Sequence, residues 1–425
     1  MSVIQRLLEQ NRDLSGWRIN EMNTVSYELF FVHRKLETIR ATDTVTTNVT
    51  VYVDHDGKKG DSSFDISAAM TEADIKQKIE TAVHRAKLVY NEPYELPEGG
   101  AETAELPSNM KDRDPKELGQ QIADAVFAAD TVPGGSINAC EIFLYRDTVR
   151  VINSRGIDKI QQKHWVMIEA IPTFTEGAES VELYEDHRFT DFDPAKVTAE
   201  ISRRMAEARD RFTAKKPDVP MEINVLLRHH EITELLSELA DDLNYQSVYM
   251  HANLHKTGDD LQENGDGDKL TVTMKAQVPG SEESASFDAD GAAFIDTCVI
   301  RDGVAAANFG SSRFGQYLGV ERPTGNLPCI QAEAGTLTEA DMKKAAYLEC
   351  ASMSGLQLDL YNDYIGGEIR LAYYFDGEKT VPVTGISMSG KLSAALASLR
   401  LSRSIVTEGA YEGPQYLMIQ GMTVL

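Results

Sequence analysis

The stretch at residues 221–239 constrains the fold of this chain more than any other. Apolar residues occupy every second position from 223 to 227, which predicts a strand. Apolar residues then recur at helical spacing from 232 to 239, which predicts an amphipathic helix. The triplet His229-His230-Glu231 stands between the two patterns. The chain must therefore pass directly from a strand into a helix at a point rich in possible metal ligands.

A histidine followed by a glutamate at a helix start is where zinc peptidases keep a metal ligand and a general base. Such a site needs a second histidine about one helical turn later, at position 233 or 234. Thr233 and Glu234 occupy those positions. The segment thus has the frame of a zinc site without its second ligand.

Length and charge exclude several classes of protein. A chain of 425 residues is too long for one core and predicts two or three domains. Its 42 basic and 67 acidic residues give a net charge of −25, and its lysines and arginines form no stripe along the sequence, so we expect no nucleic-acid binding. No apolar run approaches the roughly 20 residues that span a bilayer, so we expect no membrane segment. The four cysteines are far apart, which predicts reduced thiols in a cytoplasmic protein.

The first half of the chain is predicted to contain two similar units. In the first, at about 2–90, helices at 2–14 and 72–89 flank strands at 27–32, 36–41, 48–54 and 62–66. In the second, at about 115–213, helices at 115–129 and 194–213 flank strands at 141–145 and 149–153, joined by a turn at Arg146-Asp147, and a hairpin at 165–189. The similarity of Glu28-Leu-Phe-Phe-Val32 to Glu141-Ile-Phe-Leu-Tyr145 supports this internal duplication.

A proline-containing segment at 215–220 marks a domain boundary. We therefore predict an N-terminal domain at 1–216, in which two αββ-type units form a sheet covered by helices. The C-terminal domain at 217–425 is predicted to be mostly β, sandwich-like or barrel-like, with helices at 338–351 and 389–399. The predicted fold class is α+β.

A resemblance to a known family rests on short motifs in a fixed order. The chain resembles the TldD/PmbA family, whose members were once called modulators of DNA gyrase and are grouped as metallopeptidases. The similar stretches are Val51–Gly60 with Ser62-Ser-Phe64, Ser286-Phe-Asp-Ala-Asp-Gly291, Val299-Ile-Arg-Asp-Gly-Val304, Gly315-Gln-Tyr-Leu-Gly319, Pro323-Thr-Gly-Asn326, Glu333-Ala-Gly335, Gly366-Gly-Glu368, Val381-Pro-Val383, Gly385-Ile-Ser-Met-Ser-Gly390 and Gly413-Pro-Gln-Tyr-Leu-Met-Ile-Gln-Gly421.

The resemblance implies which type of subunit this chain is. In the family, the TldD-type subunit carries His-Glu-x-x-x-His at the start of the second domain, and the PmbA/TldE-type subunit lacks it. Counting from His230, the second histidine would fall at Leu235; counting from His229, it would fall at Glu234, with His230 in place of the glutamate. The chain is therefore similar to the PmbA/TldE-type subunit, and no catalytic or cofactor-binding residue can be carried over.

The family likeness also implies a function. A PmbA/TldE-like chain would belong to a peptidase assembly acting on unfolded peptides, with a TldD-like subunit or a second copy of itself as partner and zinc held by the partner. Whether this chain is itself an enzyme stays open. We expect a cytoplasmic protein that contacts neither nucleic acid nor membrane.

Two alternatives remain. His229, His230 and Glu231 could form a divergent zinc site with His251 or His255, which would make the chain an independent hydrolase. The chain could instead be a non-enzymatic protein-binding regulator. Other candidates are incomplete: the stretch 264–268 lacks the closing glutamate of a calcium loop, the stretch 385–390 lacks the glycine of a nucleophile elbow and is predicted to be a turn, and Cys329 has no nearby base except Glu333.

Overall fold

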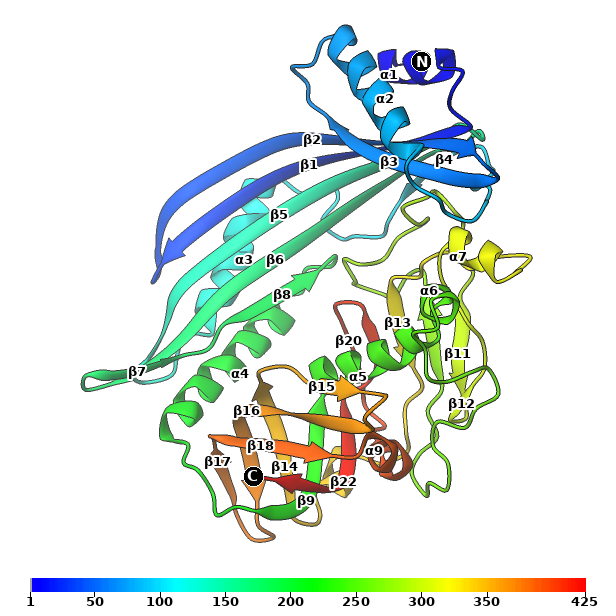
Figure 1. The fold of residues 1–425 in the computed structure, drawn as a ribbon. Coiled ribbons are helices and arrows are strands. Elements are labelled where there is room, and N and C mark those ends of the chain that lie inside the picture. The colour runs from blue at the N-terminus through cyan, green and yellow to red at the C-terminus, as the bar shows by residue number, and fades with distance from the viewer. Residues whose placement is uncertain (1) are drawn as a thin grey trace.

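The computed structural model describes residues 2–425. A long curved sheet forms the N-terminal half, and a group of shorter strands forms the C-terminal half (Figure 1). The predicted α+β class is confirmed, as are a helix-covered N-terminal sheet and a barrel-containing C-terminal region. The boundary at 216/217 and the internal duplication stay predictions. No helix within residues 2–425 is long and apolar enough to cross a membrane.

The N-terminal sheet is built mainly from long antiparallel strands, in the order β3-β2-β1-β5-β6-β4, with β7 and β8 also pairing with β6. The helices are α1 (Val3–Gln10), α2 (Glu72–Ala86), α3 (Pro115–Ala128) and α4 (Pro194–Thr213). The strands are β1 (Gly16–Val32), β2 (Lys35–His55), β3 (Lys58–Ile66), β4 (Ala101–Glu105), β5 (Gly135–Asn153), β6 (Asp158–Glu176), β7 (Glu179–Glu182) and β8 (Glu185–Phe189).

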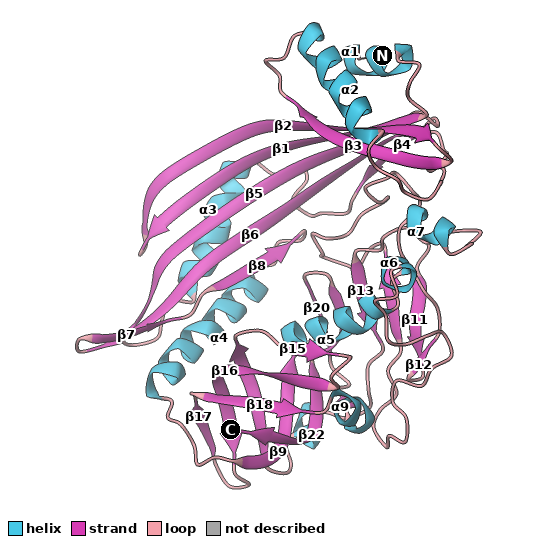
Figure 2. Ribbon diagram, in the orientation of Figure 1, coloured by secondary structure: helices cyan, strands magenta, loops and turns pink. Residues whose placement is uncertain are grey.

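All four of these helices pack on the same face of the sheet (Figure 2). Trp17 and Ile19 of β1 join the core under α1 and α2, whereas Leu29 and Phe31 join the core under α3 and α4. These four residues have odd numbers, and side chains alternate along a strand, so they share one face. The even-numbered face of β1 carries no helix of its own half.

The C-terminal half contains helices α5 (His229–Asp242), α6 (Tyr245–Tyr249), α7 (Ser312–Tyr317), α8 (Glu339–Met342) and α9 (Leu392–Ser398). Its strands are β9 (Met221–Arg228), β10 (Val272–Lys275), β11 (Thr297–Arg301), β12 (Val304–Ala305), β13 (Cys329–Ala332), β14 (Tyr347–Met353), β15 (Gln357–Asp359), β16 (Tyr364–Phe375), β17 (Thr380–Val383), β18 (Ile386–Gly390), β19 (Arg400–Leu401), β20 (Ile405–Glu408), β21 (Tyr411–Pro414) and β22 (Tyr416–Val424).

A closed barrel positions α5. The strands β14, β9, β22, β18 and β16 pair in that order, and β16 pairs back to β14. A second sheet runs in the order β12-β11-β10-β13-β21-β20. One core joins the barrel, α5 and the second sheet, with Val225, Leu235 and Val272 from these three parts all fully buried. The start of α5 is therefore held by packing on both sides.

Several predicted element boundaries were wrong. The turn at Arg146-Asp147 lies inside the continuous strand β5, because Thr24 and Trp165 donate hydrogen bonds to the two oxygens of Asp147 at 2.7 Å each, which satisfies this carboxylate within the sheet. The separate strands at 36–41 and 48–54 are one strand, β2.

Two further errors concern the C-terminal half. The predicted helix at 338–351 is the single-turn helix α8 followed by strand β14, whose residues 347–351 are all buried in the barrel wall, so tertiary packing overrides their helical propensity. The predicted turn at 385–390 is mostly the strand β18.

Candidate functional site

A cleft of about 710 Å³ separates the two halves of the chain. Residues of β7, β8 and α4 form the N-terminal wall, and residues of α5, β14, β16 and the β20–β21 turn form the C-terminal wall. The cleft also contains the three candidates His229, His230 and Glu231. The strand-to-helix junction predicted from the sequence thus opens onto this cleft.

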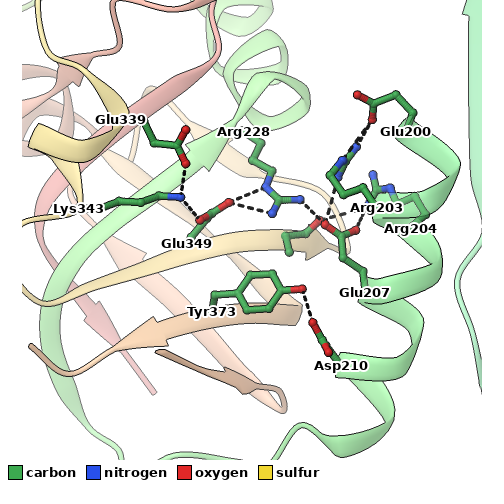
Figure 3. Close-up of polar contacts among 11 residues, drawn as sticks. Glu200, Arg203, Arg204, Glu207, Asp210, Arg228, Glu339, Lys343, Glu349 and Tyr373 are labelled. Atoms are coloured by element: carbon green, nitrogen blue, oxygen red, sulfur yellow. Dashed lines mark hydrogen bonds and ion pairs between the residues drawn. The ribbon is translucent and has the colours of Figure 1, made fainter. Parts of the chain in front are cut away.

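Arg228 lies at the N-cap position of α5, where β9 ends. It has extended backbone angles and its side chain makes no capping hydrogen bond to the helix. Its guanidinium instead turns to the ion pairs between the two halves of the chain (Figure 3). The N-cap side chain therefore satisfies none of the first backbone N–H groups of this 14-residue helix.

A buried ion-pair network crosses between α4 and the barrel (Figure 3). Arg228 Nη1 lies 2.6 Å from Glu207 Oε1, and Arg228 Nη2 lies 2.8 Å from Glu349 Oε1. Glu207 also accepts from Arg203 at 3.1 Å and from Arg204 at 2.8 Å. Arg204 Nη1 also donates to the carbonyl oxygen of Ala351 on β14. The network fixes α4 of the N-terminal half against the barrel of the C-terminal half.

Charge balance keeps the carboxylates of this network ionised. Burial alone would raise the pKa of Glu207, but the guanidinium groups of Arg204, Arg228 and Arg203 lower it below its ordinary value. Burial would likewise raise the pKa of Glu349, and Arg228 and Lys343 lower it. The network is therefore a set of mutually neutralised charges, which suits a structural joint between the two halves.

His229 contacts a carboxylate of the β20–β21 hairpin. Its Nε2 lies 3.3 Å from Glu408 Oε2, and His187 Nδ1 of β8 lies 3.8 Å from Glu408 Oε1. Burial lowers the pKa of His229 despite this carboxylate. Burial would raise the pKa of Glu408, but the two histidines lower it to about 2. At neutral pH we therefore assign an ionised Glu408 beside a neutral His229.

The other residues of the triplet point to different surroundings. His230 is exposed, and its Nε2 lies 3.8 Å from Glu234 Oε1. Glu231 is buried, and burial raises the pKa of its carboxyl group. Leu235 is fully buried in the C-terminal core, and Thr233 donates to the carbonyl oxygen of His229.

The remaining candidate histidines lie at the other end of α5. His255 Nδ1 bonds to Asp242 Oδ2 at 2.9 Å, and Asp242 is the last residue of the helix. A helix rises 1.5 Å per residue, so Asp242 is roughly 20 Å from His229 along the axis. His251 follows α6 and is exposed. The structure does not bring His251 or His255 to His229 and His230.

These positions do not fit a family-type zinc centre. Zinc needs three or four His, Cys or carboxylate ligands at about 2 Å in tetrahedral order. Glu408 engages His229, His230 turns towards solvent, and a leucine fills position 235. Within residues 2–425, no group of three or more His, Cys, Asp or Glu side chains has the arrangement to hold a metal ion.

Cys329 is no better placed as a nucleophile. Its thiol is buried beside Ser281 and Ser284, and burial raises its pKa. Sequence reasoning missed Arg228 and Glu408, which line the cleft, and Glu207 and Glu349, which pair with Arg228. Two signals were available: Arg228 directly precedes the helix start, and arginine and glutamate recur at helical spacing in α4.

Comparison with known proteins identifies the family. Residues 220–425 match the family profile described as the PmbA/TldA metallopeptidase C-terminal domain. The whole chain superimposes on the crystal structure of TldE from Thermococcus kodakarensis, with a TM-score of 0.81, 13% identity and 100% of both chains covered. The chain belongs to the TldD/PmbA family. A search of curated proteins gave no match.

Two further solved structures share the fold of this TldD/PmbA member. One is a protein described as a modulator of DNA gyrase from Thermotoga maritima, with a TM-score of 0.78, 15% identity and coverage of 100% of this chain and 99% of that chain. The other, with the same description, is from Bacteroides thetaiotaomicron, with a TM-score of 0.78, 14% identity and coverage of 99% and 97%. At these identities the likeness concerns the fold.

Proposed function

We propose that this chain is the PmbA/TldE-like subunit of a cytoplasmic TldD/PmbA-type peptidase assembly, and that a TldD-like partner holds the catalytic zinc. One observation carries the proposal: the family's strand-to-helix frame is present at β9 and α5, while Leu235 and the Glu408–His229 contact occupy the places where ligands would be needed. Its role is to bind unfolded peptide and complete the enclosure around it.

The face of the N-terminal sheet without helices supports peptide binding. Phe30, Phe143, Tyr145 and Trp165 form a continuous row there, with ring centroids 5.7, 6.0 and 4.4 Å apart. Aromatic side chains offer apolar contact to many different peptide sequences. Met167 of β6 pairs with Phe143 and with Arg188 of β8, and paired residues share a face, so the row leads to the cleft.

The far end of the β1–β2 hairpin supports a partner. Residues 35–46 of β2 form an edge that β3 does not cover, because β3 pairs only with residues 47–55. Side chains of both faces are accessible along most of this edge, including Ile39, which is 49% exposed, and Val45, which is 64% exposed. An exposed edge strand with apolar side chains is a ready surface for another chain.

Reconstitution with the TldD-like protein of the same genome tests the proposal. We expect a stable complex by size-exclusion chromatography, zinc only in the partner, and hydrolysis of unfolded peptide only by the mixture. Val45→Asp should weaken the complex, whereas Leu88→Asp, at an equally exposed residue outside the hairpin, should not. A chain that forms no complex and closes on itself as a stable dimer would contradict the subunit role.

Metal analysis addresses the independent-hydrolase alternative. Protein purified without chelator should hold substoichiometric zinc, unchanged by His229→Ala or His230→Ala. One zinc per chain that is lost in both variants would favour the divergent site instead. Specific capture of another protein by a chain that binds neither peptide nor a TldD-like partner would favour a regulator.

A further inference from the structure

The cleft gathers arginine in a strongly acidic chain. Six arginines line it, contributed by four elements, although the chain as a whole carries a net charge of −25: Arg188, Arg203, Arg204, Arg211, Arg228 and Arg370. Arginine side chains present planar forks of N–H donors that match carboxylate groups. A cleft of this composition favours an anionic group in its interior.

Two of these arginines are available to a ligand. Arg203 and Arg228 are committed to Glu207, and Arg188 pairs with Asp186 at 2.8 Å. By contrast, Arg370 bonds only to the hydroxyl of Ser354, at 2.9 Å, among the described residues. Arg211, in the last turn of α4, has neither a hydrogen bond nor an ion pair within residues 2–425.

A buried acidic group in the same cleft is also without a partner. Glu282 is 6% exposed, and its Oε2 atom accepts no hydrogen bond from any described residue. A buried acceptor without a donor is unfavourable, and a ligand N–H group would satisfy it. The cleft therefore offers separate places for a carboxylate and for an N–H donor.

This combination distinguishes a peptide from a polyphosphate. Phosphates also bind arginine forks, but Glu182, Asp186, Glu282 and Glu408 line the same cleft and would repel a chain of phosphates. A peptide presents N–H donors and carboxylates alternately, and the aromatic row beside Arg188 suits its apolar side chains. Charge complementarity thus selects, as the occupant, a peptide that carries carboxylate groups together with N–H donors.

We propose that the cleft binds carboxylate groups of an extended peptide through Arg211 and Arg370, while Glu282 accepts an N–H group of the same peptide. This inference rests on the proposed peptide-binding function and names its preferred substrate class. The carboxylate can be the peptide's C-terminus or an Asp or Glu side chain. Either source would bring a carboxylate group to the two arginines.

Fluorescence anisotropy with the full chain tests this inference. The probes are a short unstructured peptide containing several glutamates, its glutamine analogue, and the C-terminal amide of each. We expect the acidic peptide to bind about tenfold more tightly than its glutamine analogue if side chains are bound, because charge-assisted hydrogen bonds are worth about 1.5–3 kcal/mol. If the C-terminus is bound instead, amidation of the C-terminus should weaken binding by a similar factor.

Matched variants locate the effect. Arg211→Gln and Arg370→Gln should each remove most of the preference for carboxylate, whereas Arg209→Gln, also on α4 but outside the cleft, should change it less than about twofold. Thermal unfolding of each variant confirms that it is folded. Glu282→Gln should weaken every probe equally, because it alters the N–H acceptor.

Four outcomes overturn the inference. Equal binding of all four probes would refute the carboxylate preference and leave the proposed peptide-binding function intact. If the preference is unchanged in both Arg211→Gln and Arg370→Gln, the carboxylate is bound at other residues. A single-stranded oligonucleotide that displaces the acidic peptide at equal charge concentration would assign the cleft to polyanions. Failure to bind any probe, alone or with a TldD-like partner, would contradict the proposed function as well.

Discussion

Glu207 is the acceptor shared by the arginines of the buried ion-pair network between the two halves. Its side chain is 2% exposed and accepts from Arg203, Arg204 and Arg228. Removing one partner of a buried ion pair is strongly destabilising, because the remaining charge stays buried without compensation. Replacing the whole pair by apolar residues has a much smaller effect. The carboxylate is therefore required by the arginines around it.

Glu207→Ala is expected to lower the free energy of unfolding by about 3–5 kcal/mol, since it leaves three guanidinium groups without their shared acceptor. Denaturant unfolding measures the change. Glu200→Gln is the control, because Glu200 is partly exposed and pairs with Arg203 alone, so about 1 kcal/mol or less is expected. A loss below about 1 kcal/mol in Glu207→Ala would contradict the role assigned to this network.

Glu408 predicts a dependence of stability on pH. The histidine contacts lower its pKa from 4.5 to about 2, so the unfolded chain binds the proton more tightly than the folded chain. Stability from this group is thus fully present above pH 4.5 and is lost as the pH falls towards 2. Glu408→Gln should be less stable than the wild type at neutral pH, and the difference should shrink across this window.

Thermal unfolding at a series of pH values measures this effect. Glu321→Gln is the control, because Glu321 is exposed and forms no ion pair within residues 2–425. Parallel pH profiles for wild type and Glu408→Gln between pH 4.5 and 2 would show that the His187 and His229 contacts do not stabilise the folded state.

At the scale of elements, α5 explains why the sequence motif fails as a metal site. Residues five apart on a helix point in directions about 140° apart. His230 faces solvent, so Leu235 faces the core. The apolar spacing that predicted the helix therefore also places Leu235 in the core. A ligand at this position could not reach a metal ion bound by His230.

Leu235→His, which restores the family's histidine spacing from His230, is expected to destabilise the fold by about 2–5 kcal/mol and to add no stoichiometric zinc. Denaturant unfolding and metal analysis check the two parts. Glu238→His places the same side chain at an exposed position of the same helix and should cost about 1 kcal/mol or less. Tight zinc binding by the Leu235→His protein would show that position 235 can reach a metal ion and would refute its assignment to the core.

Much of the arrangement of elements could be predicted, because amphipathic periodicity survives into the folded state. Helix α4 has exactly the bounds expected from its apolar spacing, and β9 leads into α5 as predicted. The errors arose where polar residues are satisfied by partners distant in sequence. Asp147 resembled a turn residue until Thr24 and Trp165 supplied its donors.

The candidate site was less predictable than the fold. His229 was found from a local motif, but its partner Glu408 lies 179 positions further along the chain, and Glu207 and Glu349 reach Arg228 from separate elements. Nothing in the sequence near any one of these residues indicates the others. Composition likewise concealed the arginines of the cleft, because they come from four elements of an acidic chain.

At the scale of the whole molecule, α4 connects two bodies. Val197 and Ile201 pack under the N-terminal sheet, while Glu207 and Asp210 reach the barrel, where Tyr373 donates to Asp210 at 2.9 Å. One helix therefore packs in the N-terminal core and makes polar contacts with the barrel. Cooperative unfolding of the two halves should depend on these contacts.

We expect the wild type to unfold in one calorimetric transition and Arg228→Met in two, the first with a lowered midpoint. Glu207 and Glu349 retain other cationic partners in this variant, while the buried ion pairs that join α4 to the barrel are lost. Arg209→Met is the control, because Arg209 is exposed and pairs only with its neighbour Asp210. A single transition in Arg228→Met, coincident with that of the wild type, would show that the halves are coupled by other contacts.

The contacts between α4 and the barrel also limit how thick a ligand the cleft can hold. The cleft cannot widen without breaking Glu207–Arg228 and Arg204–Ala351, which hold its opposite walls. If the cleft binds peptide as proposed, these contacts would favour a single extended strand over a packed domain. Selection for unfolded chains would then come from the shape of the opening, in addition to the carboxylate preference of its arginines. How readily a protein is bound would depend on how often it unfolds by itself.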